Sequence, residues 1–264
     1  NWFKIGEIVN FPLMYHYRIM TYRGEHINID IDKSVLKDFV EYWGNDVNVG
    51  NYMIDRANAN YELVLCFEYI PYVLETWLLE NSGKIQKTWD ELSRAIAFLG
   101  KKGIIHFDLH FGNILTDGED IYLTDFGLVL DKSFALSEEE VCFFEENRFY
   151  DYGEVLRNLG HLIRGWYNSC SEEDKFIIIE KYGIDKDWEN YKLGKVLLDN
   201  IEQINADGDI NLTLDKFYVD SIVKYRSIIT LIQNFFVEIW TNNRKDTQFP
   251  NAQLQVMLEE TGFI

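Results

Sequence analysis

Cysteine and proline are scarce in this sequence of 264 residues. The three cysteines, Cys66, Cys142 and Cys170, lie far apart, and no CxxC pair or His/Cys cluster occurs, so the sequence indicates neither a disulfide framework nor a zinc site. Only three prolines interrupt the chain, while aromatic residues make up 16% of it. This composition is typical of a folded, largely helical globular protein. Unpaired cysteines are typical of a reducing compartment, so we expect an intracellular, cytoplasmic protein.

Long apolar runs and positive charge are also missing. No apolar run approaches the ~18 residues that a membrane span needs, and no signal peptide is recognised. With 44 Asp and Glu against 25 Lys and Arg, the formal net charge is −19. Nucleic acids and anionic membranes would be repelled by this charge. We therefore expect no nucleic-acid partner and no membrane span, and an acidic surface that either suits basic partners or keeps the protein in solution.

Hydrophobic periodicity predicts a small β-containing N-terminal part followed by a helical C-terminal part. A strand of alternating aromatic and aliphatic residues follows Pro12, and the apolar run 61–70 predicts a second, buried strand. Two short strands, residues 113–118 and 120–126, flank an Asp-Gly turn. Helical spacing is found in the segments 34–43, 73–82, 88–103, 150–167, 172–183, 215–240 and 251–262.

The helix predicted over residues 88–103 has recognisable ends. Thr88 is expected to be its N-cap, because Glu91 follows three residues later as in a capping box. Gly100 or Gly103 is expected to end it. The most informative segment of the chain begins directly after this helix.

That segment carries polar residues at a fixed spacing. His106, Asp108 and Asn113 fit H-x-D-x-x-x-x-N, and a DFG triplet begins at Asp125, twelve residues after Asn113. In this order the two motifs resemble the catalytic loop and the metal-binding loop of the eukaryotic-like protein kinase superfamily. The resemblance implies a phosphotransferase that uses ATP, with Mg²⁺ or alternatively Mn²⁺ as the metal. Isolated turn or capping aspartates would explain each motif alone, but not both in order.

The resemblance assigns a role to each motif residue. Asp108 would be the catalytic base that accepts or orients the hydroxyl, and Asn113 and Asp125 would hold the metal and its nucleotide. His110 stands where Ser/Thr kinases carry a lysine that steadies the γ-phosphate. A histidine there can still donate a hydrogen bond, so we expect it to contact the phosphate during catalysis. His106 is expected to be a packed structural residue.

The resemblance extends to both sides of the motifs. The stretch "NFPLMYHYRIM" resembles the linker and strand after the regulatory C-helix, and "LVLCFEYIP" resembles the strand that leads into the adenine-binding hinge. The stretch "RFYDYGEVLRNLGHLI" resembles the long buried helix of the large lobe, which implies that Asp151 braces the catalytic-loop backbone. The implied adenine-binding residues are Phe67, at the gatekeeper position, Glu68, Tyr69 and Ile70.

The segment after the DFG triplet departs from the kinase pattern. Phe107 replaces the arginine that normally pairs with a phosphorylated activation segment, so control by phosphorylation of that segment is not expected. Residues 128–150 contain no proline and hence no Ala-Pro-Glu anchor. Their acidic run "SEEEVCFFEENR" would favour a basic protein substrate, although a solvated helix start with Ser137 as N-cap explains the same run equally well.

Two further features leave alternatives open. The stretch "HFDLHFGN" also resembles small-molecule phosphotransferases such as aminoglycoside and choline kinases, whereas Leu128 after the DFG triplet is closer to protein kinases. Kinases also place a glycine-rich loop, a strand lysine and a C-helix glutamate ahead of the "NFPLMY" equivalent. Here nine residues precede Asn10, and no two of the 17 glycines are spaced as G-x-G. Lys4 and Glu7 lie only three residues apart, whereas the lysine–glutamate pair must bridge a strand and a separate helix. We therefore expect Lys4 and Glu7 to be exposed residues on the last turns of the C-helix.

Three explanations of this deficit stay open: the natural protein contains the missing elements, another chain supplies them, or the protein is a pseudokinase that acts as a scaffold or allosteric partner. We predict a protein-kinase-like bilobal α+β fold, with a truncated N-terminal β lobe (residues 1–70: the end of the C-helix, the following strands and the hinge) and a mainly helical C-terminal lobe (residues 71–264). The predicted function is Ser/Thr protein phosphorylation. The sequences in and around the motifs resemble those of divergent viral or bacterial-effector kinases. Such a kinase would work in a host cytoplasm or a virion.

Overall fold

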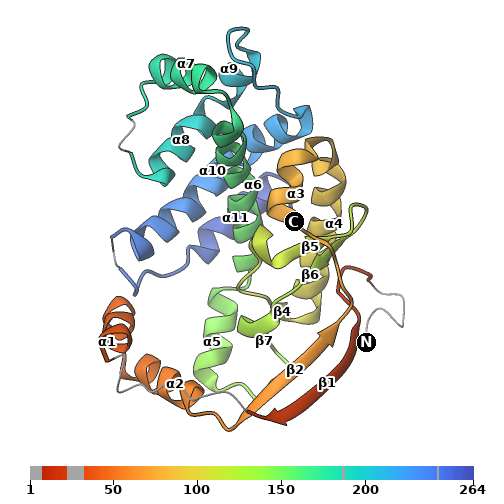
Figure 1. Cartoon of the computed structure of the whole chain (residues 1–264), viewed down its shortest axis with the longest axis vertical. Coiled ribbons are helices and arrows are strands. Elements are labelled where there is room, and N and C mark those ends of the chain that lie inside the picture. Colours follow the sequence, from red (N-terminus) through yellow and green to blue (C-terminus); the bar gives the residue numbers. More distant parts are fainter. Residues whose placement is uncertain (1–7, 23–32, 186–187, 243) are drawn as a thin grey trace. The chain divides into compact units, whose positions relative to one another are not determined.

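The computed structural model describes residues 8–22, 33–185, 188–242 and 244–264, and Figure 1 shows its elements. Two compact units make up the chain. The smaller unit comprises Leu13–Tyr69 and Glu238–Thr247, and the larger comprises residues 8–12, Ile70–Val237 and Gln248–Ile264. Helices dominate and the sheets are small, which confirms the predicted α+β class. Lys4 and Glu7 lie outside the described residues.

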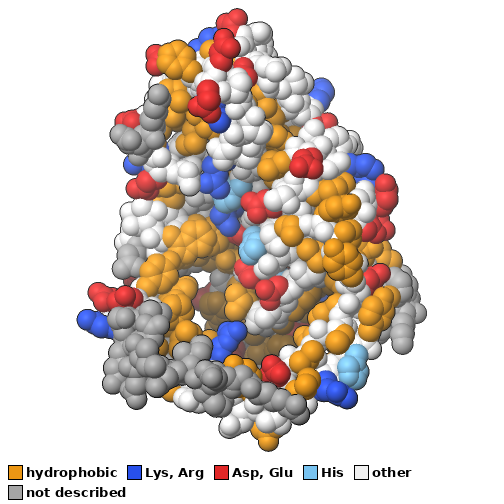
Figure 2. Space-filling model, viewed as in Figure 1, with side chains coloured by type: hydrophobic (Ala, Val, Ile, Leu, Met, Phe, Trp, Pro, Cys, Tyr) orange, Lys and Arg blue, Asp and Glu red, His pale blue; other side chains and the backbone are white. Residues whose placement is uncertain are grey.

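The smaller unit is built on an antiparallel ribbon of two strands. Its elements are β1 (Met14–Thr21), α1 (Lys33–Tyr42), α2 (Val47–Ala57) and β2 (Tyr61–Phe67). Both strands were predicted, but the prediction that the second is buried is wrong, because every residue of β2 is exposed. Successive side chains of a strand point to opposite faces. Continuous exposure therefore means that both faces of the ribbon are open, and Figure 2 shows apolar side chains along it.

The larger unit contains most of the described helices. They are α3 (Leu74–Glu80), α4 (Ile85–Lys102), α5 (Glu138–Glu146), α6 (Tyr150–Ser169), α7 (Glu172–Tyr182), α8 (Asn190–Asp199), α9 (Ile201–Ala206), α10 (Lys216–Trp240) and α11 (Asn251–Glu260). Each helix predicted beyond residue 72 corresponds to one of these. Among the described residues, no helix has the length and apolar character needed to cross a bilayer.

Helix α4 begins earlier than predicted. Its first residue is Ile85, so Thr88 is not the N-cap but a buried residue of the helix. The side chain of Glu91 points into the unit, where it accepts the backbone N–H of Ile121 at 3.0 Å. The helix ends at Gly103, whose φ of +75° is the left-handed conformation that glycine adopts without strain.

Short strands and 3-10 turns surround the predicted catalytic segment. The strands are β3 (Tyr72–Val73), β5 (Ile114–Thr116) and β6 (Ile121–Leu123), which form one sheet in the order β3-β5-β6, and β4 (Ile104–Ile105) and β7 (Leu130–Asp131), which form another. The 3-10 turns are η2 (Ser82–Lys84), η3 (Phe111–Asn113) and η4 (Phe126–Leu128). The β5–β6 hairpin with its Asp-Gly turn was predicted.

Helix α6 forms the centre of the larger unit's core. Thirteen of its twenty residues are buried, so side chains on nearly every side of the helix pack against neighbours. At Gly160 a β-carbon would lie 2.7 Å from Ile229 of α10, so only glycine allows this close approach. The N-terminal turn of α6 is thereby held in a rigid core, and that turn carries Asp151.

Candidate active site

The loop after β4 is fixed by a buried carboxylate. Asp151 accepts the backbone N–H of His106 at 2.7 Å and that of Phe107 at 3.0 Å, one through each oxygen. Burial raises the pKa of Asp151 to about 7, while the two N–H donors act in the opposite direction. The predicted bracing of the loop by Asp151 is confirmed. Because each oxygen has its own donor, the loop backbone has little freedom to rotate.

His106 is a packed residue, as predicted. Its ring is fully buried, with Nε2 2.9 Å from the carbonyl oxygen of Thr124 and Nδ1 accepting the N–H of Asp108 at 3.3 Å. This pattern requires the tautomer that carries its proton on Nε2. Burial also lowers the pKa of His106, so the neutral form is favoured. The ring lies 4.4 Å from that of Phe126, which belongs to the DFG triplet.

Asp108 and Asn113 are in direct contact. The Asn113 Nδ2 donates to the Asp108 carboxylate at 2.9 Å and to the Asp108 carbonyl oxygen at 3.0 Å. Both protons of the amide are thereby used to hold Asp108. The Asn113 side-chain oxygen is the acceptor end of the same amide and is left for a cation.

His110 lies on the other side of the Asp108 carboxylate. Its Nε2 is 3.6 Å from an Asp108 oxygen, and its Nδ1 accepts the N–H of Gly112 at 3.1 Å. An Nδ1 that accepts a hydrogen bond leaves the proton of the neutral ring on Nε2, which faces Asp108. At Gly112 a β-carbon would lie 2.9 Å from the His110 ring, so a larger residue there would displace this ring. The structure thus brings together Asp108, His110 and Asn113, three of the predicted site residues.

Asp125 has a distinct backbone conformation. Its φ of +58° is left-handed, which is uncommon for a residue other than glycine, and its carboxylate has a long contact of 3.4 Å with the N–H of Gly127. The side chain is exposed and largely free to bind a ligand. Mg²⁺ commonly takes one or two carboxylate or amide oxygens from a protein and the rest from phosphates and water. Asp125 and Asn113 offer such oxygens, and the described residues contain no cluster of three or more His, Cys, Asp or Glu that could enclose a metal alone.

Thr124 joins the two motifs, and the sequence analysis missed it. Its N–H and its Oγ1 both donate to the carbonyl oxygen of Asn113, at 3.0 and 2.7 Å, while its own carbonyl oxygen is bound by His106. Asn10 supports the same hairpin by donating to the carbonyl oxygen of Ile121 at 2.9 Å. The only sequence signal for Thr124 is its place directly before Asp125.

The predicted adenine-binding residues lie at the end of β2 and directly after it. The backbone N–H of Glu68 donates to the carbonyl oxygen of Leu13 at 2.8 Å, and the Glu68 carboxylate accepts the Leu13 N–H at 3.2 Å. The side chains of Phe67 and Tyr69 are exposed, whereas Ile70 is buried in the larger unit. Glu68 is therefore held by its own strand pair, and its N–H is already used.

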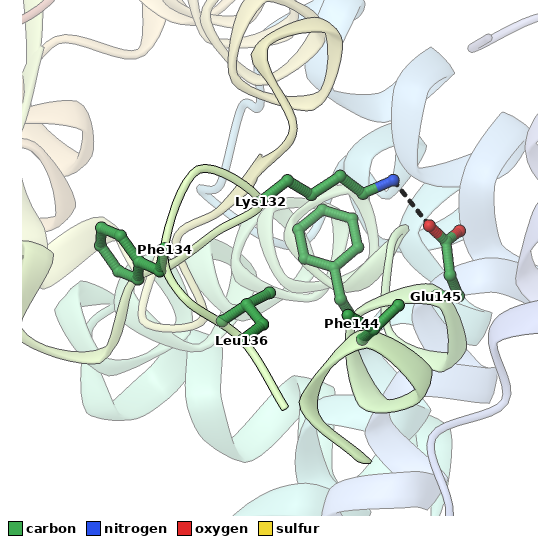
Figure 3. A pocket seen from close by; sticks show the side chains of 6 residues that line it. Lys132, Phe134, Leu136, Phe144 and Glu145 are labelled. Atoms are coloured by element: carbon green, nitrogen blue, oxygen red, sulfur yellow. Dashed lines mark hydrogen bonds and ion pairs between the residues drawn. The ribbon is translucent and has the colours of Figure 1, made fainter. Parts of the chain in front are cut away.

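A cavity of about 360 Å³ lies between β7 and α5. Phe134, Leu136, Val141 and Phe144 form its apolar lining, and Figure 3 shows the ion pair between Lys132 and Glu145 across it, 2.6 Å long. Ser137 is the N-cap of α5, as predicted, and it also forms a capping box with Glu140. Glu138, Glu139 and Glu140 occupy the first turn of the same helix, and Glu145 is the acidic residue that lines the cavity itself.

A comparison with protein families finds that the family model of the protein kinase domain matches residues 48–161 of this chain. The matched segment begins in α2, contains both motifs and ends in α6. No curated protein shows a significant match to the chain.

Proposed function

We propose that this chain, whose residues 48–161 match the protein kinase domain, is a Ser/Thr protein kinase that transfers the γ-phosphate of Mg·ATP to a protein hydroxyl. The observation that carries the proposal is the 2.9 Å contact between Asn113 and Asp108, in a loop that Asp151 holds by two buried hydrogen bonds. Phosphoryl transfer needs little covalent chemistry from a protein, but it does need groups that are positioned in advance.

Asp108 is the proposed base. A carboxylate fixed by the Asn113 amide can accept the hydrogen bond of an incoming hydroxyl and orient its oxygen toward the phosphate. The Asn113 oxygen and the Asp125 carboxylate are the proposed metal ligands. Bound Mg²⁺, or Mn²⁺ in its place, would neutralise charge on the phosphates.

His110 is the proposed phosphate contact. With its Nδ1 occupied by the Gly112 N–H, the neutral ring presents an Nε2–H beside Asp108. A phosphoryl oxygen within reach of Asp108 would also be within reach of this donor. A lysine would supply a permanent charge at that place. A histidine supplies a directional hydrogen bond from a ring whose charge depends on pH.

The proposed ligands beyond this cluster are adenine and a basic protein segment. Backbone groups of residues 67–70 would bind adenine, and the smaller unit would be the partial small lobe of residues 1–70. Glu138, Glu139 and Glu140 in the first turn of α5, the helix that lines the apolar cavity of Figure 3, support a substrate that carries positive charge beside an apolar side chain. The exposed free cysteines Cys66 and Cys142 fit the proposed reducing cytoplasm.

The test combines nucleotide binding with turnover. Thermal shift with Mg·ATP at ~100 times its Kd should stabilise the wild-type fold by about 2.7 kcal/mol. Asp108→Asn should keep this shift and lower phosphotransfer to basic peptides by at least about 100-fold, whereas Asp125→Asn should lose the metal-dependent part of the shift. Full turnover by Asp108→Asn would refute the assignment.

The same experiment separates the alternatives. A wild-type chain without any nucleotide shift would be a pseudokinase. A chain that binds Mg·ATP and phosphorylates aminoglycosides or choline but no peptide would be a small-molecule kinase.

A further inference from the structure

Phe107 has a strained backbone conformation. Its φ is +64°, a left-handed value that costs an aromatic residue free energy and persists only where the surroundings impose it. Its N–H is held by Asp151 on one side. The next residue is Asp108, so the conformation of Phe107 determines both where the proposed base lies and where the phenyl ring points.

The Phe107 ring lies in an aromatic cluster that reaches α5. It stacks on Phe143 of α5, with centroids 5.5 Å apart and an angle of 28° between the planes, and it lies 5.1 Å from the Tyr150 ring. Tyr150 in turn lies 5.0 Å from Phe249, close to α11. The catalytic loop, α5 and α6 are thus connected through one set of rings.

The rest of α5 is anchored by other groups, but none of these anchors bonds to the catalytic loop. Phe144 is buried, Glu145 pairs with Lys132, and the carbonyl oxygen of Glu145 accepts from Asn251. Phe143 is the α5 residue whose ring reaches Phe107, although half of its surface is exposed to water. Phe143 is half exposed and Phe107 has a strained backbone, so the stacking of their two rings is the interaction that stabilises this arrangement.

The charges around this segment do not favour a phosphate. Position 107 carries no cation, and Lys132, the basic residue between the DFG triplet and α5, is already paired with Glu145. A phosphate on Ser133 or Ser137 would lie close in sequence to the acidic first turn of α5. The segment therefore needs another way to become ordered.

We propose that the Phe107–Phe143 stack holds α5 and the segment after Gly127 against the catalytic loop, so that both phenylalanines are positioning residues and the segment reaches its working arrangement without phosphorylation. This inference rests on the proposed kinase function. In this arrangement an apolar contact, present as soon as the chain folds, takes the place of the ion pair that phosphorylation would create.

The test uses Phe143, because changing Phe107 would also alter its strained backbone. In Phe143→Ala, amide hydrogen exchange of residues 138–146 should accelerate by roughly 2- to 10-fold, the range expected from one aromatic pair. Peptide phosphorylation should show a similar fall in kcat with an unchanged KM for ATP. Phe143→Tyr keeps the ring and should restore both values. Phosphatase treatment of the wild type should leave kcat unchanged.

Phe176→Ala is the matched control for the exchange measurement. Phe176 lies in α7, away from the cavity beside α5, and is 57% exposed, against 50% for Phe143, but it makes no ring contact among the described residues. Exchange over 138–146 should stay at the wild-type rate in this variant. Equal exchange in wild type and Phe143→Ala would overturn the proposal, as would faster exchange with an unchanged kcat. If the wild type phosphorylates nothing, the proposed function fails, and the exchange rates alone still decide whether the stack holds α5.

Discussion

The two units differ in how deeply their strands are buried. In the smaller unit every residue of β2 is exposed, although its sequence is nearly all apolar. In the larger unit the short strands β5 and β6 bury Ile114 and Leu123 completely. Length and apolar character therefore do not decide burial here. What decides it is whether helices pack on the strand, as α3 does on β5 and α4 does on β6.

This contrast bears on where the chemistry can be positioned. The proposed base and its partners lie in the larger unit, where Asp151, His106 and Glu91 are buried and each has a hydrogen-bond partner. Buried polar groups with satisfied partners hold one geometry, since any movement would leave a donor or acceptor unpaired. The exposed ribbon of the smaller unit has no such constraint on its side chains.

The largest effect is expected where a buried charge loses its partner. Arg157 and Glu154 form an ion pair on α6 whose side chains are both almost fully buried. Arg157→Ala would leave the Glu154 carboxylate in the core without its cation, with only the Asn158 amide still donating to it, and we expect a loss of about 3–5 kcal/mol in the free energy of unfolding. Urea denaturation measures this loss. The double variant Glu154→Gln/Arg157→Ala should recover part of it, and a single variant as stable as the wild type would contradict the prediction.

A matched pair of leucines compares the two units directly. Leu92 in α4 is fully buried, whereas Leu63 in β2 is 62% exposed. Leu92→Ala should cost about 2–5 kcal/mol, because it removes packed methyl groups and leaves a cavity. Leu63→Ala should change the unfolding free energy by less than about 0.5 kcal/mol. Equal losses for both variants would show that the ribbon of the smaller unit is covered in solution.

Asp151→Asn is expected to have an intermediate effect that depends on pH. The amide keeps one acceptor oxygen for two N–H donors, so one donor stays unpaired at a cost of about 1–3 kcal/mol. The pKa of Asp151 is raised to about 7 by burial, so between pH 4 and 7 the folded state binds a proton that the unfolded state has released.

The sign of the pH effect follows from this difference in bound protons. The wild type should lose stability relative to Asp151→Asn as pH rises from about 4 to about 7, by at most roughly 1.4 kcal/mol per pH unit, and the difference should level off above that range. Chemical denaturation of both proteins at several pH values measures it. A constant difference across the range would show that the two N–H donors keep Asp151 ionised.

Much of the larger unit could be predicted from the sequence, because apolar spacing fixes helices locally. The roles of Asp151 and His106 came from the resemblance to kinases, and their hydrogen bonds confirm them. Thr88 was misassigned because a Thr-x-x-Glu pattern fits a helix interior as well as a helix start. What decides between the two is the bond from Glu91 to Ile121, thirty residues away, which no local pattern contains.

The missed residues share a physical reason. Thr124 acts through its backbone and hydroxyl on Asn113, and Phe107 acts through a ring contact with Phe143 across 36 positions. Both contacts depend on how distant segments pack, so their residue types carry no signal on their own. The exposure of β2 was missed for a similar reason, since an apolar run indicates a strand but does not supply the layer that would cover it.

The smallest effect is expected at the surface of the larger unit. Lys132 and Glu145 are paired at 2.6 Å, yet their side chains are 51% and 49% exposed. Water screens such a pair, so Lys132→Met should lower the unfolding free energy by no more than about 1 kcal/mol, and the difference from wild type should shrink further in 1 M salt. Urea denaturation at low and high salt measures both values, with Lys216→Met as a control at another exposed pair. If Lys132→Met lowered the free energy of unfolding as much as Arg157→Ala, the position of an ion pair in the larger unit would determine its contribution to stability more than its burial does. The contrast between the two units would then need another explanation.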